Sequence, residues 1–155
     1  MSKIRFTEPH REILARRDSI INDLTRLVDP AGLITSTDEC RAYETDALTA
    51  YRKMPLAVVL PKTTEEVSAV LKYCHDTGVK VVPRGAGTSL AGGAIPSEDA
   101  VVLGLSKMNR VLAVNYDDRF IRVEAGVTNL SVTAVVAENG FFYAPDPSSQ
   151  LACTI

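Results

Sequence analysis

A glycine-rich stretch from Pro83 to Gly93 holds the residues whose types and spacing best suit ligand chemistry. It reads P-R-G-A-G-T-S-L-A-G-G, with four glycines in eleven residues directly after an expected strand. Consecutive backbone N–H groups in such a loop form a concave nest for anionic oxygens, and Thr88 and Ser89 add hydroxyl donors. Each hydrogen bond to a charged group contributes about 1.5–3 kcal/mol, so about four or five donors can hold a pyrophosphate without a lysine cluster. On composition alone, a glycine-rich connection without a ligand is an equal alternative.

Two common phosphate-binding motifs do not fit this loop. The dinucleotide fingerprint G-x-G-x-x-G places its third glycine where this sequence, counted from Gly85 and Gly87, has Leu90. A Walker A motif needs Lys directly after its last glycine, and no glycine of this loop is followed by Lys. No helical pattern follows before Pro96. The sequence therefore predicts an anion site held by loop backbone more than by a helix N-terminus.

The bulk composition describes an ordinary globular chain and excludes several functions. Hydrophobic residues make up 46% and charged residues 23% of the 155 residues, and the net charge of -2 gives no attraction to nucleic acid. No apolar run is long enough to span a membrane, and the first residues lack the pattern of a signal peptide. Cys40, Cys74 and Cys153 form no C-x-x-C pair, which favours a reduced, cytoplasmic setting. No metal ligand set and no catalytic residue is assigned, and His10 and His75 are given no role.

A strand, a helix and a second strand must position the glycine-rich loop. Residues 56–60 form an apolar run that predicts a buried strand. Thr63 and Glu66 then have capping-box spacing, and apolar residues recur on one helical face until Gly78. A strand over residues 80–82 leads into the loop. The pattern predicts a β-α-β unit with parallel strands.

The other segments predict smaller elements around this unit. Periodicity predicts an amphipathic helix over residues 9–28, and residues 31–51 are interpreted as a connecting arm. Beyond the loop we expect further strands connected by hairpins, and a helix that begins after Thr128 and ends at Asn139-Gly140. The finish is expected to be an irregular loop, because its two prolines remove ladder donors. The expected strands cover residues 100–105, 111–114, 120–123 and, resuming the sheet, 141–143. The fold class is α+β.

Four segments carry a specific combination of motifs. They are P-K-T-T-E-E-V at 61–67, the loop at 83–93, V-E-A-G-V at 123–127, and P-D-P-S-S at 145–149 followed by C-T-I at 153–155. Through these segments, residues 31–155 resemble the FAD-linked oxidases of the vanillyl-alcohol-oxidase type. Within that family they are most similar to the FAD subunit of glycolate oxidase and its D-lactate dehydrogenase relatives. The resemblance implies the two-subdomain FAD-binding fold, incomplete at the C-terminus.

The resemblance also implies domains and cofactor-binding residues. Residues 1–50 would be an N-terminal helix and connecting arm, and residues 51–155 the N-terminal, truncated part of the FAD-binding domain. Residues 84–89 would hold the FAD pyrophosphate, and the end of the chain would line the isoalloxazine and ribityl side. The implied residues are Pro83, Arg84, Gly85, Ala86, Gly87, Thr88, Ser89, Gly92 and Gly93 in the loop, and Pro145, Asp146, Ser149, Cys153, Thr154 and Ile155 at the end.

The activity implied by the resemblance is oxidation of a small 2-hydroxy acid, of glycolate or D-lactate type, by hydride transfer to FAD. Covalent members of the superfamily carry a flavin-linking histidine where this loop has Thr88, which implies a non-covalent flavin. In the family, electrons pass to an iron-sulfur partner subunit, which would place the protein in the cytoplasm or at the inner membrane through its partners. The substrate domain would follow Ile155, so this chain alone is expected to be inactive.

Two alternatives stay open. The enolpyruvyl-sugar reductase of cell-wall synthesis belongs to the same superfamily, but its loop typically continues glycine-serine-asparagine, whereas here Gly87 precedes Thr88 and Ser89. A non-catalytic truncated remnant or interaction module would fold in part and turn nothing over. Half of an FAD site would leave apolar surface exposed, which favours self-association.

Overall fold

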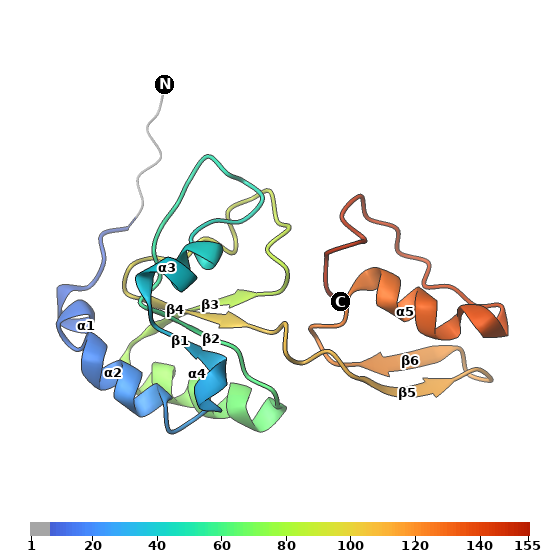
Figure 1. Cartoon of the computed structure of the whole chain (residues 1–155), viewed down its shortest axis with the longest axis horizontal. Coiled ribbons are helices and arrows are strands. Elements are labelled where there is room, and N and C mark those ends of the chain that lie inside the picture. The colour runs from blue at the N-terminus through green and yellow to red at the C-terminus, as the bar shows by residue number, and fades with distance from the viewer. Residues whose placement is uncertain (1–6) are drawn as a thin grey trace.

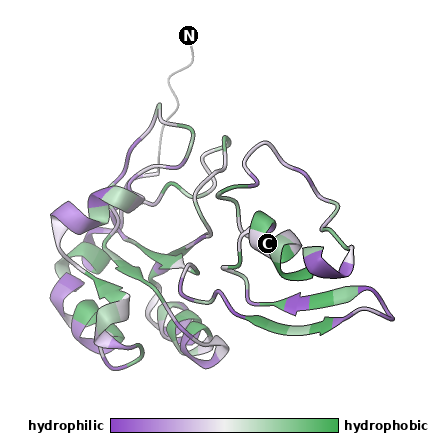
Figure 2. Cartoon of the chain, turned by 45° about the vertical axis from the view of Figure 1, so that its right-hand side comes forward, coloured by the Kyte–Doolittle hydropathy of each residue, from purple (hydrophilic) through white to green (hydrophobic). Residues whose placement is uncertain are grey.

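The structure, a computed structural model, describes residues 7–155, which form two lobes (Figure 1). The first lobe contains a four-stranded sheet in the order β1 (Leu33–Ile34), β2 (Ala57–Val59), β4 (Ala100–Gly104) and β3 (Lys80–Arg84). The second lobe contains a hairpin of β5 (Val111–Asn115) and β6 (Phe120–Val123), with helix α5 (Asn129–Val136) beside it (Figure 1). Hydrophobic residues concentrate along the strands of the first lobe and along the hairpin (Figure 2).

β4 lies between β2 and β3 and pairs with both in parallel. The predicted parallel direction of the strands on either side of the first long helix is therefore confirmed. The expectation that residues 100–105 join the next strand by a hairpin is wrong. All five residues of β4 are buried, and a strand that is apolar on both faces is stabilised by a neighbour on each side and helices on the faces.

Helix α4 (Thr64–Thr77) joins β2 to β3 and has the ends that the sequence predicts. Thr63 Oγ1 accepts a hydrogen bond of 3.2 Å from the Glu66 N–H, and Gly78 ends the helix with a φ of 74°. The buried face includes Val70 and Cys74. Burial raises the pKa of the Cys74 thiol to about 11, as expected for a cysteine that fills space in the core.

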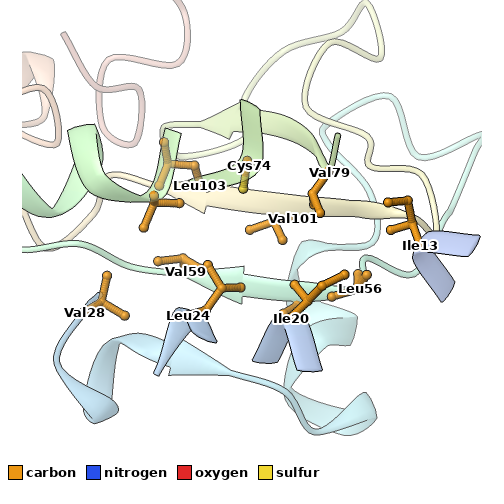
Figure 3. Close-up of a cluster of buried hydrophobic side chains, with 12 residues drawn as sticks. Ile13, Ile20, Leu24, Val28, Leu56, Val59, Cys74, Val79, Val101 and Leu103 are labelled. Atoms are coloured by element: carbon orange, nitrogen blue, oxygen red, sulfur yellow. The ribbon is translucent and has the colours of Figure 1, made fainter. Parts of the chain in front are cut away.

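The leading segment packs on the same face of the sheet as α4, and its buried residues share one cluster with Cys74 of α4 and with Val59 and Val101 of the strands (Figure 3). The single helix predicted over residues 9–28 is two helices, α1 (Arg11–Ala15) and α2 (Arg17–Leu24), because Arg16 leaves the helical region with φ -96° and ψ 9°. Ile20 and Leu24 are fully buried against the sheet (Figure 3). Complete burial of such side chains contributes about 1.5–3 kcal/mol each, so this segment is part of the core.

The segment that the sequence suggested as a connecting arm contains regular structure. A 3-10 turn (Pro30–Gly32) leads into β1, which pairs antiparallel with β2, and α3 (Thr37–Cys40) follows with a further 3-10 turn (Arg41–Tyr43). Burial raises the pKa of the Cys40 thiol as well, so this cysteine is also a core residue. The arm therefore completes one edge of the sheet.

The second lobe agrees with the sequence except at residues 141–143. The hairpin of β5 and β6 is confirmed, and α5 ends in a 3-10 turn (Ala137–Asn139) before Gly140, whose φ is 76°. Residues 141–143 form no strand. Their aromatic side chains instead line an apolar pocket between α5 and the hairpin. Phe141 and Tyr143 are half-buried there, whereas Phe142 is exposed.

Across residues 7–155, no helix combines the length and the apolar character needed to cross a membrane. The same residues contain no group of His, Cys, Asp and Glu side chains that could hold a metal ion.

Candidate cofactor site

The carboxyl ends of β3 and β4 lie at the edge of the sheet that faces the second lobe (Figure 1). Arg84 is opposite Gly104, and the Leu105 N–H donates to the Arg84 carbonyl at 3.0 Å. The glycine-rich loop and the connector (residues 105–110) therefore begin side by side. Ligands of open α/β sheets bind at this edge, because the loops that follow parallel strands gather there.

A cleft of about 310 Å³ opens at this edge. Its walls come from the start of the glycine-rich loop, the connector, the N-terminus of α5 and the last residues of the chain. None of the lining side chains carries a charge, and five of them supply a hydroxyl or amide group. The lining residues are Gly85, Ala86, Ser106, Asn109, Gly126, Val127, Thr128, Ser131, Ala152 and Thr154.

The loop presents a row of unpaired backbone donors. Within residues 7–155, the N–H groups of Ala86, Gly87, Thr88 and Ser89 donate to no protein acceptor. The Gly87 carbonyl accepts a hydrogen bond of 3.0 Å from the Ala47 N–H, which holds the loop backbone in place. Gly87 has a φ of 75°, a conformation that favours glycine. Adjacent free N–H groups on a held backbone are the arrangement that binds an anion.

The end of the chain folds back over the N-terminus of α5. The N–H groups of Asn129 and Leu130 donate to the carbonyls of Cys153 and Gln150, at 3.0 and 3.3 Å. These carbonyls bind helix N–H groups that have no partner within the helix. The N-terminus of α5 is thus closed by the protein, and the free donors of the cleft are those of the loop and the side chains.

The buried amide of Asn129 also holds the preceding turn. Its Nδ2 donates to the Pro145 carbonyl at 3.0 Å, and only 4% of the residue is exposed. Asn129 therefore connects both parts of the chain end, the P-D-P-S-S turn and the last three residues, to one helix.

Gly85 and Thr154 bring the loop and the chain end together. A Cβ atom on Gly85 would overlap Thr154 Oγ1, so the loop approaches this closely only because residue 85 is glycine. Thr154 in turn forms an antiparallel bridge with Thr128, and the Ile155 N–H donates to the Val127 carbonyl at 3.0 Å. The two segments that the resemblance assigns to one cofactor therefore meet in the structure.

Three of the residues predicted to bind the cofactor line this cleft: Gly85, Ala86 and Thr154. Thr88 and Ser89 are half-buried on the loop, whereas Pro145 and Asp146 are exposed on the turn. Contact with the cofactor stays a prediction for all of these residues, and the following ones do not line the cleft: Pro83, Arg84, Gly87, Thr88, Ser89, Gly92, Gly93, Pro145, Asp146, Ser149, Cys153 and Ile155.

The V-E-A-G-V segment closes the junction between the lobes. Glu124 is buried and accepts from Arg110 through Nη2 at 2.6 Å, Nε at 3.0 Å and the backbone N–H at 2.8 Å. The hydrogen bonds from Arg110 hold the pKa of the Glu124 carboxyl below its usual range. The Gly126 N–H donates to the Met108 carbonyl at 2.8 Å, and a Cβ there would overlap the Leu105 carbonyl oxygen.

Several cleft residues were not singled out by the sequence. Ser106 and Asn109 follow β4, and a rule that searches the residues after every parallel strand would have found them. Thr128 was interpreted only as a helix cap, yet its hydroxyl lies 2.6 Å from Ser131 Oγ and both residues face the cleft. Ala152 carries no polar side chain and therefore no signal.

The donor set fits the diphosphate of FAD. Free backbone N–H groups and neutral hydroxyl groups are present at the cleft, and Gly85 allows the loop and the chain end to approach each other closely there. Such groups stabilise an anion by directed hydrogen bonds without a free cation.

Comparisons with known proteins identify the family. The family model described as "FAD binding domain" matches residues 55–155. The glycolate oxidase subunit GlcD of Escherichia coli K12 is 45% identical over 139 residues, which cover 90% of this chain and 28% of that protein. The D-lactate dehydrogenase of Archaeoglobus fulgidus is 36% identical over 135 residues, which cover 86% of this chain and 30% of that protein.

A solved structure supports the fold independently of sequence. The crystal structure of p-cresol methylhydroxylase with substrate bound superposes with a TM-score of 0.72 at 21% identity, and the match covers 85% of this chain and 26% of that one. This chain thus spans less than a third of the length of the relatives it matches. By its family match the chain belongs to the FAD-binding domain family, and it shares its fold with p-cresol methylhydroxylase.

Proposed function

We propose that this chain binds FAD in the cleft between its lobes and is the FAD-binding part of an oxidoreductase that oxidises a 2-hydroxy acid. The observation that carries the proposal is the row of free N–H groups at residues 86–89, beside a cleft lined by neutral hydroxyl and amide groups. When bound, FAD accepts a hydride from the carbon that bears the substrate hydroxyl.

The glycine-rich loop has the task of holding the pyrophosphate. Its backbone N–H groups donate to the phosphate oxygens, and the hydroxyls of Ser106, Thr128 and Thr154 complete the cradle from the other walls of the cleft. Thr88 has no nucleophilic ring nitrogen for a covalent bond to the flavin, so FAD is held by non-covalent contacts.

The end of the chain has the task of orienting the flavin. Residues 145–149 and 153–155 face the isoalloxazine and ribityl side, and Asn129 holds both in place through its backbone N–H and its side-chain amide. A flavin held between the loop and this turn is fixed at both ends, which favours one orientation for hydride transfer.

The names of two relatives, which refer to glycolate and D-lactate, support the proposed substrate class. Both are small 2-hydroxy acids, and either suits the same hydride transfer. We include in the proposal an iron-sulfur partner subunit that takes the electrons, and a cytoplasmic location that reaches the inner membrane through such subunits. The word "subunit" in the name of the E. coli relative is consistent with this arrangement.

A chimera tests this proposal. The matching 139 residues of the E. coli subunit are replaced by those of this chain, and bound flavin and dye reduction are measured with glycolate and D-lactate. We expect the chimera to purify with non-covalent FAD and to oxidise at least one of the two acids, and the same chimera with Gly85→Val to lose its flavin. A folded chimera without flavin would contradict FAD binding. A flavin-loaded chimera that oxidises neither acid would contradict the proposal that this chain can serve as the FAD-binding part of a 2-hydroxy-acid oxidoreductase.

A further inference from the structure

The Arg84 side chain turns away from the cleft and supports the loop from behind. Its Nη1 donates to the Thr45 carbonyl at 2.7 Å, and the guanidinium lies over the Tyr43 ring, 5.6 Å from the centroid. A Cβ atom on Gly87 would overlap this guanidinium, so the loop folds directly over it. The Arg84 side chain therefore packs against the side of the loop that faces away from the cleft. The free N–H groups of the loop remain available to a ligand.

The contacts of Arg84 come from a support segment (residues 43–48) that lies before the part of the chain matched by the family model. The Ala47 N–H donates to the Gly87 carbonyl at 3.0 Å. The side chain of Leu48 lies 3.8 Å from the point that a Cβ atom would occupy if residue 92 were not glycine. The support segment thus contacts the glycine-rich loop near its start and near its end.

Asp46, in the support segment, is a buried acid with one unpaired carboxylate oxygen. It is 4% exposed, and its Oδ1 accepts from the Leu48 N–H at 2.9 Å. Its Oδ2 is buried without a hydrogen-bond partner, the only such side-chain atom within residues 7–155. A buried carboxylate oxygen without a hydrogen-bond donor destabilises the folded state, so packing gives no reason for an acid at this position.

The nearby Arg84 guanidinium gives a reason for a carboxylate at position 46. The residues on either side of Asp46 contact Arg84 and the loop, through the Thr45 carbonyl at 2.7 Å from Arg84 Nη1 and the Ala47 N–H at 3.0 Å from the Gly87 carbonyl. Burial lowers the pKa of the Arg84 guanidinium, and the negative charge of Asp46 acts in the opposite direction. Arg84 takes part in none of the direct ion pairs of the described chain. A nearby carboxylate offsets part of the cost of burying a guanidinium and so favours its half-buried position.

We propose that Asp46 and Arg84 act together as positioning residues for FAD, with the guanidinium as the support on which the loop folds and the carboxylate as its counter-charge. This inference rests on the proposed FAD site. It assigns part of the cofactor affinity to the support segment, which contributes no residue to the lining of the cleft. The loop N–H groups converge on the pyrophosphate only while the backbone is held over Arg84.

The test is a double-mutant cycle on the FAD dissociation constant, measured by flavin fluorescence in the whole chain. We expect Asp46→Asn and Arg84→Met each to weaken FAD binding about tenfold, and the double variant to bind about as weakly as either single variant, because the pair acts as a unit. Amide hydrogen exchange of residues 86–89 without FAD should speed up in each variant.

A matched control separates positioning from general stability. Asp99 is another buried carboxylate of the same lobe, paired with Lys80 at 2.8 Å at the opposite ends of the strands. Asp99→Asn should lower the unfolding temperature and leave the FAD affinity unchanged. If Asp46→Asn does not fold, Tyr43→Leu removes the ring beneath the guanidinium without touching a buried charge, and should weaken FAD binding in the same way.

The outcomes distinguish this inference from the proposed function. A wild-type chain that takes up no FAD would overturn the proposed site itself. A wild-type chain that binds FAD while the Asp46, Arg84 and Tyr43 variants bind it equally well would overturn the inference alone. Additive effects of Asp46→Asn and Arg84→Met would show that the two residues do not work as a pair.

Discussion

Gly85 is the residue at which the loop and the chain end touch. Its lack of a Cβ atom allows Thr154 Oγ1 to lie against the loop backbone at the wall of the cleft. A side chain at position 85 has to displace Thr154, and Thr154 is bridged to the start of α5 through Thr128. The geometry of the proposed cofactor site therefore depends on one missing methyl group.

Gly85→Ala is expected to weaken FAD binding by about tenfold or more, because the added Cβ pushes the chain end away from the loop. Flavin fluorescence titration measures this. Ala91→Ser serves as the control, since Ala91 is exposed in the same loop and its N–H already bonds to Ser89 Oγ. Equal FAD affinity in Gly85→Ala and the wild type would show that the loop and the chain end do not share a ligand.

Asp99 shows how a buried charge stabilises the first lobe. It accepts hydrogen bonds from Lys80 Nζ at 2.8 Å, the His10 N–H at 2.9 Å and Ser97 Oγ at 2.6 Å. Burial acts to raise the pKa of the Asp99 carboxyl, but these hydrogen bonds outweigh it and hold the pKa below the ordinary value of 3.8. The ionised form thus stabilises the folded state and ties the N-terminal segment to β3.

Asp99→Asn is expected to lower the free energy of unfolding by about 1–3 kcal/mol at neutral pH. Because the pKa is lower in the folded state, the contribution is complete above the ordinary value of 3.8 and disappears as the pH falls below it. Urea unfolding of both proteins at neutral pH and below the ordinary pKa checks this. A difference that stays constant into acid would contradict the assigned role of the charge.

At the scale of elements, α4 could be predicted because its signals are local. Its cap, Thr63, and its stop, Gly78, lie within the helix sequence itself. β1 could not be predicted, since two residues carry no periodicity and the strand exists through pairing with β2. The central place of β4 was missed for the same reason, because its partners β2 and β3 precede it in the chain and no hairpin turn marks the pairing.

The candidate site divides in the same way. The glycine-rich loop could be predicted, because four glycines after a strand are a local signal. Ser106 and Asn109 could not, since they face the cleft only through the placement of the second lobe. The role of the support segment was missed entirely, because its contacts to Arg84 and Gly87 span about forty residues of sequence, as the separation of 39 between Thr45 and Arg84 shows.

Helix α5 acts as the anchor for the chain end through Asn129. Asn129→Ala removes the hydrogen bond to the Pro145 carbonyl, and we expect a loss of about 1 kcal/mol in the free energy of unfolding and faster amide exchange at residues 146–153. Hydrogen exchange with mass spectrometry resolves this segment. Asn139→Ala, which removes an exposed 2.9 Å bond to the Tyr116 hydroxyl in the same lobe, should leave the segment unaffected. Unchanged exchange in Asn129→Ala would show that the turn is held by other contacts.

At the scale of the whole molecule, two lobes meet at one junction (Figure 1), and the cleft is lined by residues of both lobes. Gly126 lies where the chain passes close to the connector, and the ion pair of Arg110 and Glu124 stands next to it. At position 126 the backbone of the connector leaves no space for a side chain. The lobes therefore keep their separation through backbone contact.

Gly126→Ala tests this junction. Its Cβ would overlap the Leu105 carbonyl oxygen, so we expect a loss of stability of about 1–3 kcal/mol together with a loss of FAD affinity, while the secondary structure of each lobe is kept. Thermal unfolding, circular dichroism and flavin titration on one sample measure all three. Full FAD affinity in this variant would show that the cofactor does not bridge the lobes.

The most direct test of the account is backbone amide NMR of the 155-residue chain during addition of FAD. We predict saturable shifts at the free N–H groups of residues 86–89 and at Thr154, with smaller changes along the rest of the cleft. Saturating FAD that leaves residues 86–89 unchanged, or that shifts only the residues of the apolar pocket between α5 and the hairpin, would contradict the central claim.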